Sequence, residues 1–409
     1  MTDQFVCLLN MDVLQGLKKI PDESVDLVMS SPPYWGLRDY GVEGQHGLEP
    51  HPQQWIDKEV KIFHELRRVL KPTGSVFWNV GDSYYTKSGV RGKFNDGKWL
   101  QTKQLMLMPS RLAVALQNDG WCLRSDIIWH KPTPMPSSVK DRLANTYEHV
   151  FHFVKKSKGY YYDLDAIREP HSSAIKRGQV DNKGNVDYRG LNKNAFTKEQ
   201  RLKEHLRPEI LSGGDGRTRA GLDSKTKLEK MNPSGKNPGD FWEMATQPYS
   251  KAHFAVYPIK LCEKPIKACV PDEICVKCEK ARERIIRTTY TASCNKSADG
   301  QHNEPKAITK HLRQSGNYDT PQSMKYGRAN AQHITMSWTS CGCNAGFRGG
   351  VVLDPFAGSG TTGEAVRKWK PNASIWLIEL NSEYCDLIKK RVKWGQQGLK
   401  PITYEVVVW

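Results

Sequence analysis

A glycine-rich turn stands between an apolar run and a helical pattern at residues 351–366, VVLDPFAGSGTTGEAV. The apolar run predicts a buried strand that ends at Asp354, and Gly358 and Gly360 would let a ligand approach the backbone. Free N–H groups at the start of the following helix favour an anionic group. An ordinary strand-to-helix turn is the plainer alternative, but the pattern indicates a nucleotide-type site. ATP is not expected, because no lysine stands where a P-loop carries one.

An acidic residue ends the next apolar run, where residues 375–378 (IWLI) lead into Glu379. A carboxylate at this strand tip, about twenty residues beyond the glycine turn, is placed to accept hydrogen bonds from two ribose hydroxyls. A surface glutamate that caps the next helix is the alternative. The pairing of this acid with the glycine turn favours the ribose role.

Two prolines follow another apolar run, residues 26–30, in the sequence SSPPYW. Pro32 and Pro33 stiffen this loop and remove two N–H donors. Ser31 adds a hydroxyl, and Tyr34 adds an aromatic face. A rigid turn with a packed tyrosine would explain the same residues, but the combination suits a planar ligand that bears an amino group.

Two closely spaced cysteine pairs, Cys275-x-x-Cys278 and Cys341-x-Cys343, can close a tetrahedral Zn²⁺ site. Because protein thiolates would fill all four positions, such a site would be structural. It would tie together the ends of the insertion between the pairs. The alternative is a set of unrelated free thiols. Three other residues are possible substitute ligands: Cys269, Cys294 and His333.

The elements that must position these residues alternate between strand and helix patterns. Strands are expected at residues 5–10, 26–30, 75–80, 125–130, 148–155, 351–353 and 374–378. Helices are expected at residues 13–20, 55–70, 109–119, 361–368 and 383–394. The helix at residues 55–70 is expected to stop at residues 71–74, KPTG. This alternation predicts an α/β fold with a parallel sheet covered by helices.

The charge balance favours a polyanionic partner. The 409 residues include 61 Lys and Arg against 44 Asp and Glu, for a formal net charge of +17. Nucleic acid is the expected partner, because each neutralised phosphate releases counterions; a merely basic protein is the alternative. No apolar run reaches the roughly 18 residues of a membrane span, and the N-terminus lacks signal-peptide features. We therefore expect a cytoplasmic protein with no membrane partner and with reduced cysteines.

SPPY at residues 31–34 and DPFAGSGTT at residues 354–362, in this order, resemble the β class of DNA amino-methyltransferases. Further matching segments are VDLVMSSPPYWGLRDYG, FWNVGDSYY (77–85), SDIIWHKPTPMPSSVKDR (125–142), HFAVYP (253–258) and IELNSEYCDLIKKR (378–391). They cover both ends of the chain and its sheet, and they leave out two atypical segments. The resemblance implies a Rossmann-like, S-adenosylmethionine-dependent methyltransferase sheet with inserted target-recognition and zinc-tied segments.

The resemblance also implies site residues. The catalytic loop would be formed by Ser31, Pro32, Pro33 and Tyr34. The cofactor would be held by Asp12, His253, Phe254, Asp354, Phe356, Gly358, Gly360, Thr361 and Glu379. The target base would leave duplex DNA to reach the methyl donor.

The substrate base is expected to be cytosine, methylated at N4, because serine at the first loop position is typical of that branch. An N6-adenine enzyme on the same fold is the alternative. An RNA methyltransferase and a catalytically inactive, zinc-containing DNA-binding protein are weaker readings. A cognate restriction endonuclease is a further candidate partner.

The expected organisation follows the motifs. Residues 1–164 form the catalytic half, residues 251–270 line the cofactor pocket, and residues 349–409 form the cofactor-binding half. Residues 165–250 are the expected target-recognition insertion, and residues 271–348 the zinc-tied insertion. Lys140 and Arg142, which follow a proline-rich turn, are expected to touch the DNA backbone.

Overall fold

The computed structural model describes residues 4–85, 101–134, 136–169, 235–247, 256–292, 329–392 and 403–408. The chain divides into two compact units. One unit contains Met1–Ile167, Pro238–Ile285 and Ser337–Trp409, and the other contains Arg168–Asn237 and Ile286–Met336. The first unit carries the large sheet and every site below. Most of the expected target-recognition insertion lies outside the described residues.

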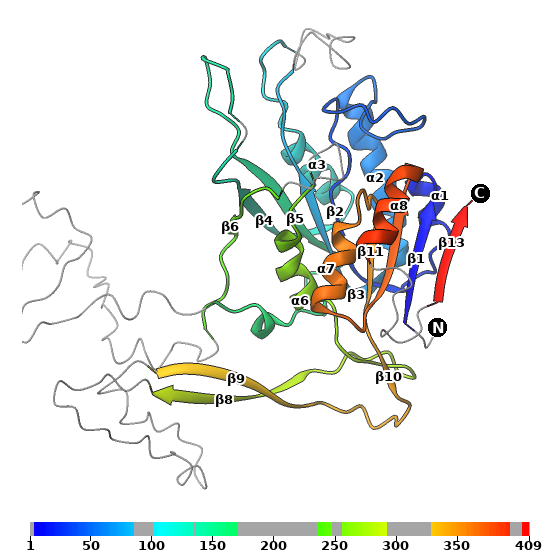
Figure 1. Ribbon diagram of the computed structural model, residues 1–409, viewed down its shortest axis with the longest axis vertical. Helices are drawn as coiled ribbons and strands as arrows, with labels where there is room; N and C mark the ends of the chain where they lie inside the picture. Colours follow the sequence, from blue (N-terminus) through cyan, green and yellow to red (C-terminus); the bar gives the residue numbers. More distant parts are fainter. Residues whose placement is uncertain are drawn as a thin grey trace, which may run out of the picture. The chain divides into compact units, whose positions relative to one another are not determined.

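Nine strands form one sheet in the order β13-β1-β12-β11-β2-β3-β5-β4-β6 (Figure 1). Their bounds are β1 Phe5–Asn10, β2 Val25–Ser30, β3 Leu70–Val80, β4 Cys122–His130, β5 Tyr147–Val154, β6 Phe241–Glu243, β11 Val351–Asp354, β12 Ser374–Glu379 and β13 Thr403–Val408. Two further pairs, β7 (Ile274–Cys275) with β10 (Phe347–Arg348) and β8 (Arg284–Ala292) with β9 (Ala329–Trp338), are separate.

The helices are α1 Val13–Leu17, α2 Pro52–Val69, α3 Met108–Asn118, α6 Glu263–Cys269, α7 Thr361–Trp369 and α8 Ser382–Arg391, with short 3-10 turns at Leu164–Ala166 and Ile259–Cys262. Side chains alternate along each strand, so every central strand contributes to two cores. In β1, Cys7 and Leu9 join a cluster with α1, α2 and α3, whereas Val6 and Leu8 join a cluster with α6, α7 and α8. Helices therefore cover both faces, as the alternating pattern predicts.

The sheet is mixed rather than parallel throughout, which corrects the expectation. Strand β5 runs antiparallel to both β3 and β4, while β1, β2, β3, β11 and β12 pair in parallel. The physical reason is the connection: no helix lies between β4 and β5, so the chain reverses between them as in a hairpin.

Helix α2 ends at Val69, as the KPTG segment predicts, and β3 begins at Leu70 and runs through that segment. Lys71 is buried and pairs with the buried Asp26 on β2 at 2.7 Å. The pair holds the start of β3 against its neighbour despite Pro72 and Gly74. The pairing register shifts here, between Val25 and Leu27.

The site lies where strand order reverses. From β2 the chain moves outward to β3, and from β11 it moves to β12 on the other side, yet β2 and β11 are neighbours. In such sheets a crevice forms outside the carboxyl ends of the two central strands. The SPPY loop follows β2 and the glycine turn follows β11, so both reach this crevice.

Helix α2 shows the amphipathic pattern of a helix lying on a sheet. It begins at Pro52 behind His51, whose ring nitrogen accepts the Gln53 N–H at 3.1 Å, and it buries Trp55 and Phe63. Across the described ranges, no helix combines the length and apolar character required to span a membrane.

Candidate active site

A cavity of about 290 Å³ opens at the carboxyl ends of the central strands. Loops after β1, β2, β11 and β12 form its walls, and β3 contributes Asn79. Nine residues expected from the sequence line it: Asp12, Ser31, Pro32, Pro33, Tyr34, Phe356, Gly358, Thr361 and Glu379. The fold thus brings the SPPY loop and the glycine turn around one space.

Gly358 and Glu379 touch each other at the cavity wall. The Gly358 N–H donates to Glu379 Oε2 at 2.8 Å, and the Asn381 N–H donates to Oε1 at 2.8 Å. Gly358 has φ of 52°, and no atom lies within 4 Å of where its Cβ would be, so the turn leaves space beside the backbone. Burial raises the pKa of Glu379 to about 7.

Asp354 is fully buried and does not line the cavity. Its carboxylate accepts hydrogen bonds from Ser30 Oγ at 2.6 Å, Thr362 Oγ1 at 2.6 Å, Tyr257 Oη at 3.1 Å and the Phe356 N–H at 3.1 Å. Burial raises the pKa of this carboxyl. Asp354 therefore joins the end of β2 to the glycine turn and positions the lining residues, without reaching the cavity itself.

Gly360, like Asp354, does not line the cavity; it packs against helix α8. It caps α7 with φ of 84°, and a Cβ there would lie 3.2 Å from the Cα of Ile388 on α8. Its neighbour Thr361 does face the cavity, and the Thr361 hydroxyl accepts a hydrogen bond from Arg391 at 2.9 Å. Gly360 thus serves the packing of α7 against α8, and Thr361 lines the cavity.

Asp12 combines a structural and a lining position. Its carboxylate accepts the Leu14 N–H at 2.9 Å and the Gln15 N–H at 3.3 Å, which caps α1. This cap fixes the side chain at the end of β1, where it borders the cavity.

Two side chains from other elements, Asn79 and Glu148, contact the SPPY loop, and Lys131 in turn contacts Glu148. Tyr34 Oη donates to Glu148 Oε2 at 2.6 Å and lies 3.1 Å from Ser31 Oγ. Asn79 Nδ2 lies 2.8 Å from Tyr34 Oη, 2.8 Å from Glu148 Oε2 and 3.2 Å from Ser31 Oγ. Lys131 pairs with the other oxygen of Glu148. Burial and the negative Glu148 raise the pKa of Tyr34, so its hydroxyl stays protonated.

Sequence reasoning missed Asn79, Glu148, Lys131 and Tyr257. A weak signal existed for each of them. Glu148 is an acid next to the apolar run of β5, and Asn79, Lys131 and Tyr257 stand inside the matched segments 77–85, 125–142 and 253–258. The contacts of Glu148 with Tyr34 and of Tyr257 with Thr362 could not be read from the sequence, because only the folded chain brings these distant residues together.

His46 was missed as well. Its ring stacks between Trp55 and Phe356, with centroid distances of 5.7 and 5.6 Å. Burial alone would lower the pKa of His46, but the hydrogen bond to Glu59 and the nearby Glu49 carboxylate, 3.2 Å from Nδ1, outweigh that effect and raise the pKa. The histidine thereby holds the aromatic face of Phe356 against the cavity wall.

The expected DNA-contact residues lie away from the cavity lining. Lys140 is exposed, and the Arg142 guanidinium lies 3.6 Å from the ring centroid of Tyr84. His253 and Phe254 lie outside the described residues.

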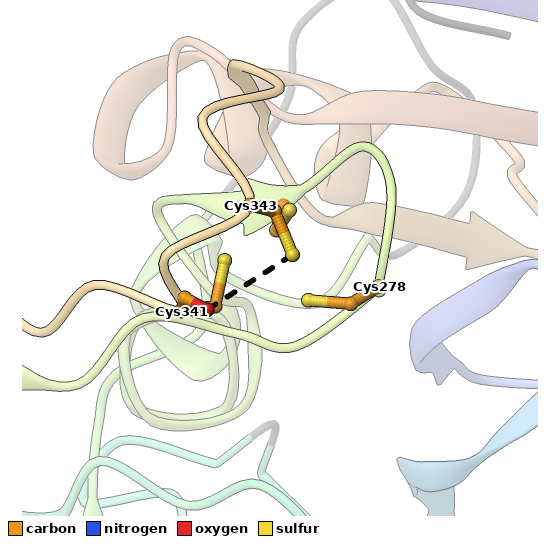
Figure 2. A group of neighbouring side chains, drawn as sticks. Cys278, Cys341 and Cys343 are labelled. Carbon is orange, nitrogen blue, oxygen red and sulfur yellow. Dashed lines mark hydrogen bonds between the residues drawn. The ribbon is translucent and has the colours of Figure 1, made fainter.

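The four cysteines of the two sequence pairs come together, and three of them are labelled in Figure 2. The sulfur atoms of Cys275, Cys278, Cys341 and Cys343 all lie within 4.8 Å of one another. Backbone N–H groups of Cys278 and Lys277 lower the pKa of Cys275, which favours its thiolate, whereas contacts with the other thiols of the cluster raise the pKa of Cys343. Of the possible substitutes, Cys269 is buried in the apolar core, and Cys294 and the His333 side chain lie outside the described part.

The chain is similar to known DNA methyltransferases. A family described as DNA methylase, N6_N4_Mtase, matches residues 25–390. Type II methyltransferase M.SfiI of Streptomyces fimbriatus is 36% identical over 335 residues, covering 64% of this chain and 79% of that relative. M.SmaI of Serratia marcescens is 29% identical over 396 residues, covering 93% and 88%. A solved PvuII DNA methyltransferase (cytosine-N4-specific) has a TM-score of 0.49 at 15% identity, covering 97% and 89%. The chain belongs to the N6/N4 DNA methylase family.

Proposed function

We propose that this DNA methyltransferase transfers a methyl group from S-adenosylmethionine to N4 of a cytosine in duplex DNA. The observation that carries the proposal is the single cavity shared by the SPPY loop and the glycine turn. Ser31 at the first position of the loop supports cytosine, since the resembling N4 enzymes carry serine there.

The cofactor half of the cavity fits a nucleoside with an extended tail. Bound S-adenosylmethionine would supply a methyl group activated by a sulfonium. Glu379 would accept hydrogen bonds from ribose hydroxyls, and the open space beside Gly358 would admit the ligand close to the backbone. Asp12 would contact the adenine and Phe356 the methionine end, with His253 and Phe254 in the segment that lines the cofactor pocket. Asp354 and Gly360 would hold the turn in shape.

The base half fits an exocyclic amine. The lone pair of such an amine is delocalised into the ring, so the amine is a weak nucleophile. Ser31 Oγ and the Pro32 carbonyl would accept its hydrogens and localise the lone pair, while Tyr34 would stack on the flipped base. No strong base is required before attack, because the nitrogen becomes acidic only as the new bond forms. Positioning and exclusion of water therefore supply most of the rate.

A product analysis tests this proposal. The protein is incubated with methyl-labelled S-adenosylmethionine and mixed-sequence duplex DNA, and the digested nucleosides are separated by mass spectrometry. Labelled N4-methylcytosine supports the proposal. Labelled N6-methyladenine would mean that the same mechanism acts on adenine instead of cytosine. Absence of any labelled nucleoside, with cofactor binding intact, contradicts DNA as the substrate of this cavity.

We also propose that the four cysteines hold a structural zinc ion. A tetrahedral site with Zn–S bonds of about 2.3 Å needs sulfur atoms about 3.8 Å apart. The observed spread of at most 4.8 Å requires only a small contraction. Positive φ at Glu279, Gly342 and Asn344 marks the tight turns that aim the sulfur atoms inward.

The remaining assignments extend this proposal to DNA and to a biological role. Residues 165–250 and the zinc-tied segment 271–348 would read the target sequence, with Lys140 and Arg142 on the phosphate backbone. Because relatives such as M.SfiI and M.SmaI are named Type II methyltransferases, a cognate restriction endonuclease would be the partner. Host DNA that becomes resistant to that endonuclease only when this chain is expressed would support the role.

A further inference from the structure

Glu148 stands at the end of a buried hydrogen-bond network that leads to the catalytic loop. Its Oε2 receives Tyr34 Oη at 2.6 Å and Asn79 Nδ2 at 2.8 Å, and its Oε1 is paired with Lys131. Tyr34 Oη in turn lies 3.1 Å from Ser31 Oγ. Glu148 itself does not approach Ser31 through any contact of the described residues, so its influence must pass through Tyr34 and Asn79.

The hydrogens of this network can be placed by donor capacity alone. A carboxylate only accepts, so Tyr34 must donate its single hydrogen to Glu148. The Asn79 amide nitrogen only donates, so it cannot accept from Ser31. The contact between the two hydroxyls then has one direction: Ser31 donates and Tyr34 accepts. Asn79 donates to one lone pair of Ser31 Oγ, so Ser31 keeps one lone pair for a ligand in the cavity and has no hydrogen to offer.

We propose that Glu148 is a positioning residue that fixes Ser31 as a hydrogen-bond acceptor, so that the cavity selects a base with an amino group. The inference rests on the proposed function. At ring position 4 of a pyrimidine or 6 of a purine, cytosine and adenine carry an amino group, whereas thymine and guanine carry a carbonyl oxygen. An acceptor-only serine attracts the first pair and repels the second.

Two other residues support this arrangement. Lys131 occupies the second oxygen of Glu148, which fixes the rotation of the carboxylate. Gly81 leaves room for the contact, since a Cβ there would lie 2.7 Å from a Tyr34 ring carbon and 3.3 Å from the Glu148 carboxyl carbon. A network of this kind, buried and fully directed, is stronger than its separate bonds.

Glu148→Gln tests the direction of the hydrogens with almost no change in shape. Lys131 still requires an acceptor, so the new amide turns its oxygen to Lys131 and its NH₂ to Tyr34. That NH₂ also faces the Asn79 amide nitrogen, so Asn79 must turn its oxygen toward it. Tyr34 then accepts from position 148 and is free to donate, so Ser31 is no longer held as an acceptor. We expect kcat to fall about 100-fold, because a bond that strengthens in the transition state is lost. The Kd for S-adenosylmethionine should not change.

Two double variants separate this role from general damage. If Glu148 acts through Ser31, E148Q added to S31A causes little further loss, whereas independent effects would multiply. In K131M/E148Q the amide oxygen is free to turn back to Tyr34, so activity should recover toward that of K131M alone. Multiplying losses, or no recovery in K131M/E148Q, would overturn the inference.

The assay is methyl transfer to mixed-sequence duplex DNA, with cofactor affinity measured by calorimetry as the folding control. The wild-type chain reports on the proposed function in the same assay, before any variant is compared. Wild-type N6-methyladenine would overturn the choice of cytosine, while the variant comparison would still test Glu148, because adenine also presents an amino group.

Discussion

Tyr34 has two separable parts, a ring that borders the cavity and a hydroxyl held by Glu148. Tyr34→Ala removes both, and we expect it to cost about 1–3 kcal/mol of transition-state stabilisation through lost base stacking. Tyr34→Phe keeps the ring and should retain more activity than Tyr34→Ala. Single-turnover methylation measures both, with calorimetry for S-adenosylmethionine. An equal loss of cofactor affinity in Tyr34→Ala would rule out the stacking role.

We expect Glu379 to make cofactor binding depend on pH. Burial raises its pKa to about 7, so the empty site holds a partly protonated carboxyl near neutrality. Ribose hydroxyls donate best to the ionised form, so binding lowers this pKa and releases a proton. Affinity for S-adenosylmethionine should therefore rise with pH through about 7 and then level off.

The control is Glu379→Gln, which should weaken binding about 10- to 100-fold and remove this part of the pH dependence. The amine of the cofactor titrates in both proteins, so the difference between the two calorimetric profiles isolates the carboxyl. Identical profiles would mean that Glu379 does not contact the cofactor.

At the scale of the elements, two glycines of one turn have different tasks. Both have positive φ, so Gly358→Ala and Gly360→Ala should each lower the free energy of unfolding by about 1–2 kcal/mol. A methyl group at 360 also meets the backbone of α8, which adds to the loss, whereas one at 358 enters open space. We expect Gly360→Ala to be the less stable protein and Gly358→Ala the weaker cofactor binder. Chemical denaturation and calorimetry check this, and a reversed order would contradict it.

The central elements could be predicted from the sequence because their patterns are local. Strand β1 has the predicted bounds, and α7 and β12 differ from prediction by one residue at the C-terminal end. The errors come from long-range pairs. The buried ion pair of Lys71 with Asp26 keeps Pro72 and Gly74 in a strand, and no local signal announces it.

The residues of the site also fall into those that local sequence patterns predict and those that long-range contacts determine. Motif residues such as Ser31 and Glu379 could be named from their types and spacing, and they do line the cavity. Glu148 could not, because its contact with Tyr34 spans 114 positions and depends on β5 lying beside β3. The sequence also could not separate the buried Asp354 from its cavity-lining neighbours.

At the scale of the whole molecule, the strands follow one order along the sequence and another order across the sheet. This difference brings the two loops of the site together. The catalytic loop comes early and the glycine turn comes late, but β11 inserts beside β2. Ser30 at the end of β2 then bonds Asp354 at the end of β11. The hydrogen bond between Ser30 and Asp354 thus joins the SPPY loop to the glycine turn, one residue before Ser31.

The cysteine cluster lies just before β11 in the sequence, where the chain enters the half that carries the glycine turn. Strand β10 carries the chain from the cysteines through Gly349 and Gly350 into β11, and the Gly350 N–H bonds Pro271 at 3.0 Å, just before β7. Both glycines are tightly enclosed: a Cβ at Gly349 would lie 2.1 Å from the Asn372 carbonyl oxygen. An ion that fixes β7 to β10 therefore also fixes the start of the cofactor-binding strand.

We expect about one Zn²⁺ per chain, bound by the four thiolates. Its removal by a chelator should lower the free energy of unfolding by on the order of 4 kcal/mol and weaken S-adenosylmethionine binding, because β11 loses its anchored entry. Cys278→Ser should reproduce the effect, whereas Cys122→Ser, at a thiol outside the cluster, should not. Metal analysis and thermal unfolding measure both. A metal-free chain of equal stability would leave β11 held by its sheet neighbours alone, and the cluster would then be four reduced thiols brought together by the β7–β10 pairing.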